Sequence, residues 1–137
     1  MGSVNPTREQ MAAMRESAGE TGPIHMINLL RFRDRAAYPE GHDCAGKNMS
    51  GKDAYKRYFA ETAHHLGNVG GRLVWSGAPS LMLIGPSDER WDMAFIAEYP
   101  SVAAMLQMLG DKAYQASAVH RTAGVEDSRL IRCTPRG

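Results

Sequence analysis

The chain contains 137 residues, enough for a single domain with one hydrophobic core, and its 16 lysines and arginines nearly balance its 15 aspartates and glutamates. With a net charge of +1 and no basic block mixed with aromatic residues, the composition argues against a nucleic-acid surface. The apolar runs are far shorter than the ~20 residues of a membrane-spanning helix, and no signal-peptide core is visible. We therefore expect a cytoplasmic protein, organised as one domain over residues 1–137, with no nucleic-acid or membrane partner.

The first 21 residues form an N-terminal extension in which a short amphipathic helix is expected. Thr7 can serve as its N-cap, and Met11, Met14 and Ala18 follow at helical spacing. Gly22 and the proline after it then end the extension.

The segment 24–32, "IHMINLLRF", predicts a buried strand with an unexpected amide at its centre. Because side chains alternate along a strand, Asn28 shares a face with Met26 and Leu30. A buried amide without partners costs on the order of 1–3 kcal/mol, so Asn28 should be held by other polar groups or by a ligand. We expect either a pocket amide that orients a ligand or a core amide bonded to backbone.

Residues 33–49 show no periodicity and are long for a connection inside a compact domain, which is typical of a lid, a binding loop or a mobile segment. Cys44 lies within this segment, and the other cysteine, Cys133, lies near the end of the chain. Without a C-x-x-C spacing, the two are expected to be free thiols.

A long helix is predicted to follow, with Ser50 as its N-cap and Gly70 and Gly71 at its end. Residues 72–85 contain two β-rich runs interrupted by Gly77 and Pro79, which predicts a strand with a kink or bulge. The alternation over 91–99 predicts a further strand.

Two helices and a last strand complete the chain. Ser101 can cap the first of these helices, and Gly110 and Asp111 break it and begin the second, over 112–124. A short strand over 127–133 ends the pattern.

The resulting order, βαββαβ after an N-terminal helix, is the ferredoxin-like arrangement of the α+β class. In this topology the first and third strands are central, and the helices cover one face of the sheet. The first strand carries large apolar residues on both faces, with Ile24, Met26 and Leu30 on one face and Ile27 and Leu29 on the other. An apolar open face predicts a homodimer with its sheets packed face to face.

Several segments together give the chain a family resemblance, among them "HMINLLRFR", "SGKDAYKRY", "WDMAFIAEYPS" and "DKAYQASAVHRTAGVEDSRLI". They resemble domain-of-unknown-function family 1330, in the dimeric α+β barrel superfamily. The resemblance implies the ferredoxin-like fold and the dimer, but no reaction. Relatives in the wider superfamily include cofactor-independent monooxygenases, polyketide cyclases, heme proteins and isomerases, so the fold does not choose a chemistry.

Tyr58 and His65 are the candidate catalytic residues. They share one helix stripe with Glu61, and a tyrosine and a histidine at a pocket rim can act as acid, base or oxyanion donor. The alternative is a half-buried helix flank whose polar tips are satisfied.

The candidate substrate-binding residues are Asn28, Arg31, His120, Arg121 and Trp75. Arg31 could pair with an anionic ligand or, at its strand end, with Glu98 or Asp92. The pair His120 and Arg121 could form an anion site near the dimer interface or interact with the C-terminal end of their helix. Trp75 could stack on an aromatic ligand or belong to the core or the interface.

No cofactor and no metal are expected. Adjacent histidines at 64 and 65 point about 100° apart on a helix and cannot share one ion as i, i+4 pairs do. Nucleotide-binding and nucleophile motifs are absent from the sequence. We expect a small-molecule-binding homodimer. If it is an enzyme, we expect cofactor-independent isomerase, cyclase or monooxygenase-like chemistry on a carbonyl, carboxylate or phenolic substrate. The alternatives are a non-catalytic binding or dimer-interaction protein and, third, a heme-binding protein using His25, His65 or His120.

Overall fold

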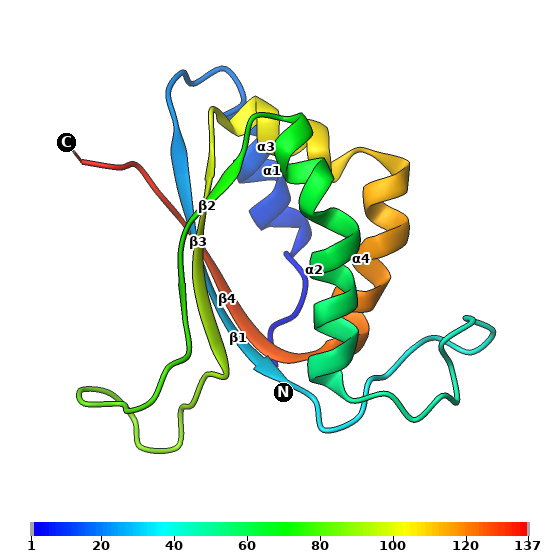
Figure 1. Cartoon of the computed structure of the whole chain (residues 1–137). Helices are drawn as coiled ribbons and strands as arrows, with labels where there is room; N and C mark the ends of the chain where they lie inside the picture. Colours follow the sequence, from blue (N-terminus) through cyan, green and yellow to red (C-terminus); the bar gives the residue numbers. More distant parts are fainter. Residues whose placement is uncertain (1, 137) are drawn as a thin grey trace.

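The computed structural model describes residues 2–136 and contains a four-stranded antiparallel sheet with helices on one of its faces (Figure 1). The strands are β1 (Ile24–Phe32), β2 (Arg72–Gly77), β3 (Met93–Tyr99) and β4 (Val125–Cys133), in the spatial order β2-β3-β1-β4. This confirms the predicted ferredoxin-like α+β fold, with β1 and β3 at the centre of the sheet.

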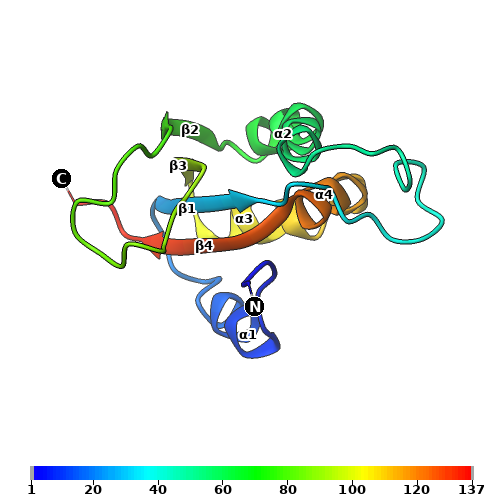
Figure 2. The ribbon, with the colours of Figure 1, turned by 90° about the horizontal axis from the view of Figure 1, so that it is seen from below.

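Helices α2 (Gly51–Asn68), α3 (Val102–Leu109) and α4 (Lys112–Gly124) lie on the same side of the sheet (Figures 1 and 2). The predicted N-caps are confirmed, because the side chains of Ser50, Ser101 and Asp111 each accept a hydrogen bond from a backbone N–H in the first turn. These caps fix where each helix begins and therefore which side chains it directs toward the sheet.

The predicted N-terminal helix is also present, as α1 (Arg8–Glu16), closed by a capping box between Thr7 and Gln10. It lies beside the β4 edge of the sheet (Figure 2). Arg132 of β4 holds it by donating to the Ser17 hydroxyl at 2.6 Å. Among residues 2–136, no helix is both long enough and apolar enough to cross a membrane.

The alternation along β1 directs one set of side chains into the core. Ile24, Met26, Asn28 and Leu30 are buried under the helices, whereas the residues between them are only half-buried. Aromatic and methionine side chains from α2, α3, α4 and β3 complete this core. Asn28 is therefore a polar residue in the buried face of a central strand, as the sequence predicts.

Within residues 2–136, no helix lies on the opposite face of the sheet. Because paired residues of an antiparallel sheet share a face, the register places Ile27, Ile96 and Ile131 there side by side, with Trp75 on the neighbouring edge strand. Ile131 and Trp75 are 48% and 54% exposed. This open face is apolar, as expected from the residues of β1.

The strand predicted over 72–85 is wrong beyond Gly77. In β2, Gly77 pairs with Ala94, and β3 begins only one residue earlier, so the second apolar run has no strand to pair with. Residues 78–92 instead form an irregular loop in which Leu83 and Ile84 are 83% and 91% exposed. The predicted irregularity in the strand is present, but earlier, where the register shifts between Leu73 and Trp75.

Residues 33–49 form an irregular strap that joins β1 to α2 and is tied down at both ends. The backbone N–H of Arg33 donates to the carbonyl of Gly124, that of Ala37 to Ala123, and that of Ala36 to Met49. The strap thus crosses the C-terminal end of α4. Both cysteines are free thiols, as predicted.

Candidate functional site

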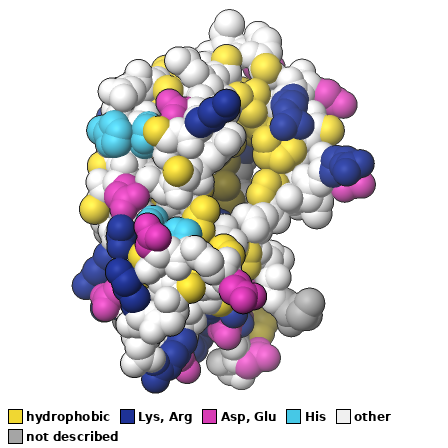
Figure 3. Space-filling view, turned by 90° about the vertical axis from the view of Figure 1, so that its right-hand side faces the viewer, with side chains coloured by type: hydrophobic (Ala, Val, Ile, Leu, Met, Phe, Trp, Pro, Cys, Tyr) yellow, Lys and Arg dark blue, Asp and Glu magenta, His cyan; other side chains and the backbone are white. Residues whose placement is uncertain are grey.

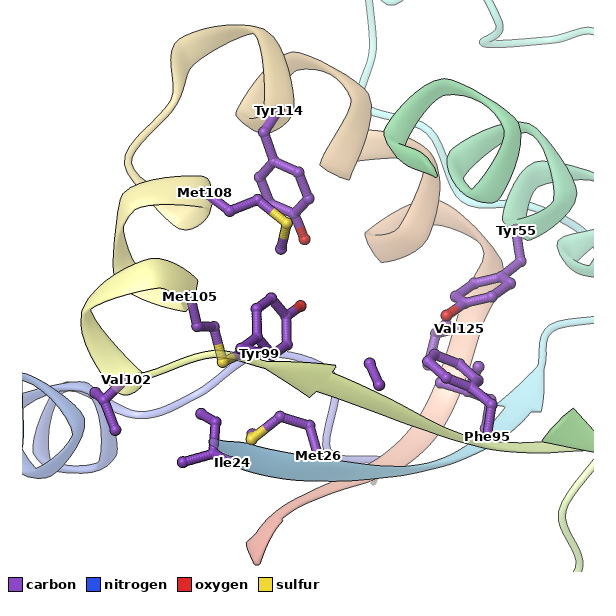
Figure 4. Packing of buried hydrophobic residues seen from close by; sticks show 12 residues of the cluster. Ile24, Met26, Tyr55, Phe95, Tyr99, Val102, Met105, Met108, Tyr114 and Val125 are labelled. Carbon is purple, nitrogen blue, oxygen red and sulfur yellow. The ribbon is translucent and has the colours of Figure 1, made fainter. Parts of the chain in front are cut away.

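Four of the five tyrosines meet between the helices and the sheet. Tyr55 and Tyr58 come from α2, Tyr99 from the end of β3 and Tyr114 from the first turn of α4. The hydroxyls of Tyr55, Tyr99 and Tyr114 point into the space between the two layers (Figure 4), and the hydroxyl oxygens of Tyr58 and Tyr114 lie 2.7 Å apart. We call the space between these side chains the tyrosine cleft.

Several polar side-chain atoms between the helices and the sheet have no protein partner within residues 2–136. Within residues 2–136, the Tyr55 and Tyr99 hydroxyls make no hydrogen bond, and neither does the side-chain oxygen of Asn28, whose amide nitrogen donates to the Met26 carbonyl at 3.1 Å. These three oxygens are nevertheless accessible to solvent. Among residues 2–136, the one fully buried side-chain nitrogen or oxygen atom without a hydrogen-bond partner is Nε of Arg33. Unpaired but accessible polar atoms indicate a place for water or a ligand.

The molecular surface is hollowed on the same side. The space-filling view, looking onto the helix side of Figure 1 from its right, shows a deep hollow with hydrophobic side chains along its walls (Figure 3). Leu130, which shares the face of Asn28 in the sheet register, is 47% exposed although it points to the helix side. The helices therefore do not fully cover this face at the β4 edge.

Arg121 supplies positive charge near the tyrosine cleft. Its guanidinium donates to the carbonyl oxygen of Val4 at 2.6 Å and to the hydroxyl of Ser128 at 3.4 Å. No carboxylate within residues 2–136 lies within salt-bridge distance of it. An arginine with only neutral partners retains its capacity to bind an anion.

Burial favours the protonated form of three phenols of the cleft, those of Tyr55, Tyr99 and Tyr114. Burial raises the pKa of Tyr114, and the adjacent Tyr58 raises it further, while the charge of Arg121 acts in the opposite direction. Burial likewise raises the pKa values of Tyr55 and Tyr99. At neutral pH these side chains are therefore hydrogen-bond donors to an oxygen placed among them.

His120, the neighbour of Arg121, faces a different part of the molecule. It is 4% exposed and lies between α2, α4 and the strap, where its ring contacts Tyr38 and Glu61. The two consecutive residues that the sequence groups as one anion site are therefore separated by the turn of α4.

His65 is also buried, but it packs between α2 and the start of α4. Its ring lies 6.0 Å from that of Tyr114, edge to face, and 4.0 Å from that of His64. It therefore supports a wall of the tyrosine cleft from behind Tyr114.

Arg31 and Trp75 lie on the open face, away from the tyrosine cleft. Arg31 donates to Glu126 at 3.0 Å and lies 3.9 Å from Asp127, so the partners are not the Glu98 or Asp92 considered from the sequence. Trp75 shares the open face with Ile96. Of the predicted site residues, Tyr58 thus lies in the tyrosine cleft, and Arg121 lies close enough to affect the pKa values of Tyr55 and Tyr114. Asn28 lies on the buried face of the sheet under the helices.

Sequence reasoning missed the other three phenols of the cleft. Tyr55 is at a position whose spacing assigns it to the buried helix face, where a tyrosine, unlike a phenylalanine, must also place a hydroxyl. Tyr99 and Tyr114 belong to elements that only the fold brings opposite α2. Their common residue type was the signal that could have been used.

The antiparallel sheet of order β2-β3-β1-β4 with its helices on one face defines a ferredoxin-like α+β protein. A family model described as a domain of unknown function, DUF1330, matches residues 45–132. The chain belongs to this family. No curated protein matches it.

Solved structures with the same fold include near and distant relatives. The RPA0582 protein of unknown function from Rhodopseudomonas palustris is 47% identical, with a TM-score of 0.91 over 100% of this chain and 99% of that chain. SnoaB, a cofactor-independent oxygenase from Streptomyces nogalater, is 16% identical, with a TM-score of 0.52 over 85% and 95% of the two chains. A dimeric protein of unknown function and ferredoxin-like fold from Bacteroides fragilis is 11% identical, with a TM-score of 0.50 over 82% and 95%. The last two share the fold.

Proposed function

We propose that this protein is a homodimer that binds a small, largely apolar molecule with a carboxylate, phenolate or enolisable carbonyl group in the tyrosine cleft. The observation that carries the proposal is the set of accessible polar atoms without protein partners, on Tyr55, Tyr99 and Asn28. Accessible polar atoms of this kind are satisfied by water or by a ligand, because an unsatisfied one costs about 1–3 kcal/mol.

The residues of the cleft fit this ligand class by charge and by hydrogen bonding. Arg121 has no carboxylate partner among residues 2–136 and suits an anionic group, and the aromatic and aliphatic walls suit an apolar body. The phenols donate to an oxygen, and Asn28 can both donate and accept.

The same groups would support proton-transfer chemistry without a cofactor. Donors fixed around a carbonyl oxygen stabilise the negative charge that develops there when a neighbouring carbon loses a proton. The distant structural relative SnoaB is described as a cofactor-independent oxygenase, which agrees with this proposal. Whether the ligand reacts depends on its own acidity.

Binding is tested with salicylate as a probe, because it combines an aromatic ring, a carboxylate and a phenol. We expect saturable binding by calorimetry that weakens by at least tenfold in Arg121→Gln, since a charge-assisted hydrogen bond contributes about 1.5–3 kcal/mol. Arg15→Gln, which removes an exposed charge from α1, is the matched control and should bind as wild type does. Equal affinities in wild type, Arg121→Gln and Tyr58→Phe would refute the assignment of the cleft.

The homodimer is proposed from the open face of the sheet. Ile27, Ile96 and Ile131 form an apolar surface there, and the loop 78–92 extends on the same side of the sheet with exposed leucine and isoleucine side chains (Figure 1). A contiguous apolar surface of this kind marks an interface. A second copy packing sheet to sheet would cover it.

Two neighbouring residues of β4 give a matched test of this interface. Ile131 lies on the open face and Leu130 on the helix side, and they are 48% and 47% exposed. Sedimentation velocity should show a dimer for wild type and Leu130→Asp and a monomer for Ile131→Asp, because a carboxylate buried without a partner costs several kcal/mol. A monomeric wild type, or an intact Ile131→Asp dimer, would exclude the interface.

A further inference from the structure

A second group of reactive side chains lies outside the tyrosine cleft, where the strap 33–49 packs on α2 and α4. The hydroxyl oxygen of Tyr38 is 2.6 Å from Nδ1 of His120, and Nε2 of the same ring is 3.5 Å from a carboxylate oxygen of Glu61. Tyr38, His120 and Glu61 therefore form a phenol–imidazole–carboxylate chain. The three residues come from three separate segments of the sequence.

The groups around Tyr38, His120 and Glu61 determine which ring nitrogen of His120 carries a proton. Arg57 and Ser117 donate hydrogen bonds to Glu61 and lower the pKa of its carboxyl, so it is ionised at neutral pH. Burial lowers the pKa of His120 despite the opposing charge of Glu61. The neutral ring then directs Nε2–H toward Glu61 and leaves Nδ1 to accept the proton of Tyr38.

Further contacts hold the phenol in place. The ring of His42 stacks on that of Tyr38 with 4.8 Å between centroids, and the sulfur of Met49, a weak acceptor, lies 3.7 Å from the Tyr38 hydroxyl. Nη1 of Arg57 donates to the thiol sulfur of Cys44 at 3.2 Å, which closes the cluster on the side of α2. Burial raises the pKa of Tyr38, with Cys44 adding to the effect, so the phenol is protonated at neutral pH.

Tyr38 also lines an open groove of about 480 Å³ between the strap and α4. Pro39, Ala118 and Val119 give the groove apolar walls, while Gln115 and Thr122 provide polar groups. A site of this size and lining suits a small, mostly apolar molecule with few polar atoms. The groove therefore borders a tyrosine whose hydroxyl proton has an oriented acceptor.

We propose that this groove is a second site, at which Tyr38 attacks the acyl carbon of a small, apolar ester, with His120 as general base and Glu61 as a positioning residue. The oxygen of Tyr38 forms a bond to the acyl carbon while its proton moves to Nδ1 of His120. The ester bond breaks, and the leaving alcohol takes that proton. Water then releases the acid from acyl-Tyr38, with His120 accepting and returning a proton in the same way.

The proposed chemistry is tested with phenylmethanesulfonyl fluoride, whose reaction leaves a stable mark. The tyrosine oxygen bonds to sulfur, fluoride leaves, and His120 takes the phenol proton. Peptide mass spectrometry should place the label on Tyr38 at least tenfold faster than on Tyr58, because the hydroxyl of Tyr58 is paired with another phenol and not with an imidazole. Preferential labelling of Tyr58 or Cys44 would overturn the proposal.

Variants of His120 and of the groove show why Tyr38 is labelled in preference to Tyr58. His120→Gln should slow the labelling of Tyr38 at least tenfold, as general-base catalysis contributes about 10²–10⁴-fold. His64→Gln removes an exposed histidine of α2 outside both sites and should leave the rate unchanged. Thr122→Trp, at an exposed position of the groove, should slow labelling by blocking access. An unchanged rate in His120→Gln would overturn the role of His120 as general base. An unchanged rate in Thr122→Trp would overturn the groove as the place where the reagent binds.

The pH profile distinguishes a positioning role of Glu61 from a structural one. In wild type the rate of labelling should rise with pH as His120 loses its proton. The ionisable groups around the Tyr38–His120 pair are Glu61, Arg57, His42 and Cys44. Glu61→Gln should move this rise to lower pH, because the neutral amide no longer stabilises the imidazolium. An unmoved profile would mean that Glu61 only supports the fold.

Discussion

The paired hydroxyls of Tyr58 and Tyr114 should show strong energetic coupling. Tyr114 is 7% exposed, and its oxygen lies 2.7 Å from that of Tyr58. Tyr58→Phe leaves the Tyr114 hydroxyl without this partner, at a cost of about 1–2 kcal/mol for a largely buried hydroxyl, and Tyr114→Phe has the converse effect. Replacing both tyrosines removes both polar groups. The free energy of unfolding lost in the double variant should therefore be smaller, by at least about 1 kcal/mol, than the sum of the losses in the two single variants.

Urea denaturation followed by circular dichroism measures this coupling. All four proteins must be compared at one protein concentration, because the stability of a dimer depends on it. Each single variant should also melt roughly 3–8 °C below wild type, given the usual scaling for a chain of this size. Tyr99→Phe is the control, since its hydroxyl has no partner within residues 2–136 and its removal should change the free energy of unfolding little.

Additive losses in the two single variants would refute the reasoning. Additivity would mean that water replaces each missing hydroxyl fully and that the 2.7 Å contact contributes nothing of its own.

Three further changes test the packing, the capping and the pH dependence of the structure. Gly51→Ala should destabilise by about 2–3 kcal/mol in urea denaturation, because its Cβ would overlap the carbonyl oxygen of Arg33. Gly67→Ala, in open space on the same helix, should instead stabilise by about 0.5–1 kcal/mol, and equal effects of the two changes would contradict the close approach at Gly51. Asp111→Ala should cost about 1 kcal/mol, since the Asp111 side chain accepts two backbone N–H groups of α4, and an unchanged melting temperature would argue against the cap. The pKa of His120 is lowered in the folded protein, so the unfolded chain binds more protons below pH ~6.5, and the free energy of unfolding should fall as the pH drops through that value. His120→Gln should reduce the slope of the free energy of unfolding against pH. An identical slope in this variant would assign the pH dependence to other groups.

The sequence by itself determined the elements and their order, because these depend on local signals. The caps at Ser50, Ser101 and Asp111 each act within one turn of a helix, and the alternation around Asn28 is a property of one strand. With βαββαβ order, the rules for connecting strands leave few arrangements, so the central position of β1 followed. The prediction of a strand after Gly77 was wrong because a strand also needs a partner to pair with, and β3 begins too late to supply one.

Only the tertiary structure decided which side chains meet. A tyrosine on α2, one at the end of β3 and one on α4 converge at the tyrosine cleft, although nothing within any one segment indicates the other two. Arg121 and His120 are neighbours in the chain, but the turn of the helix sends the first toward the tyrosine cleft and the second toward Tyr38 and Glu61. Local periodicity gives the face on which a residue lies, whereas the partners on that face come from contacts between residues far apart in sequence, which depend on how the whole chain packs.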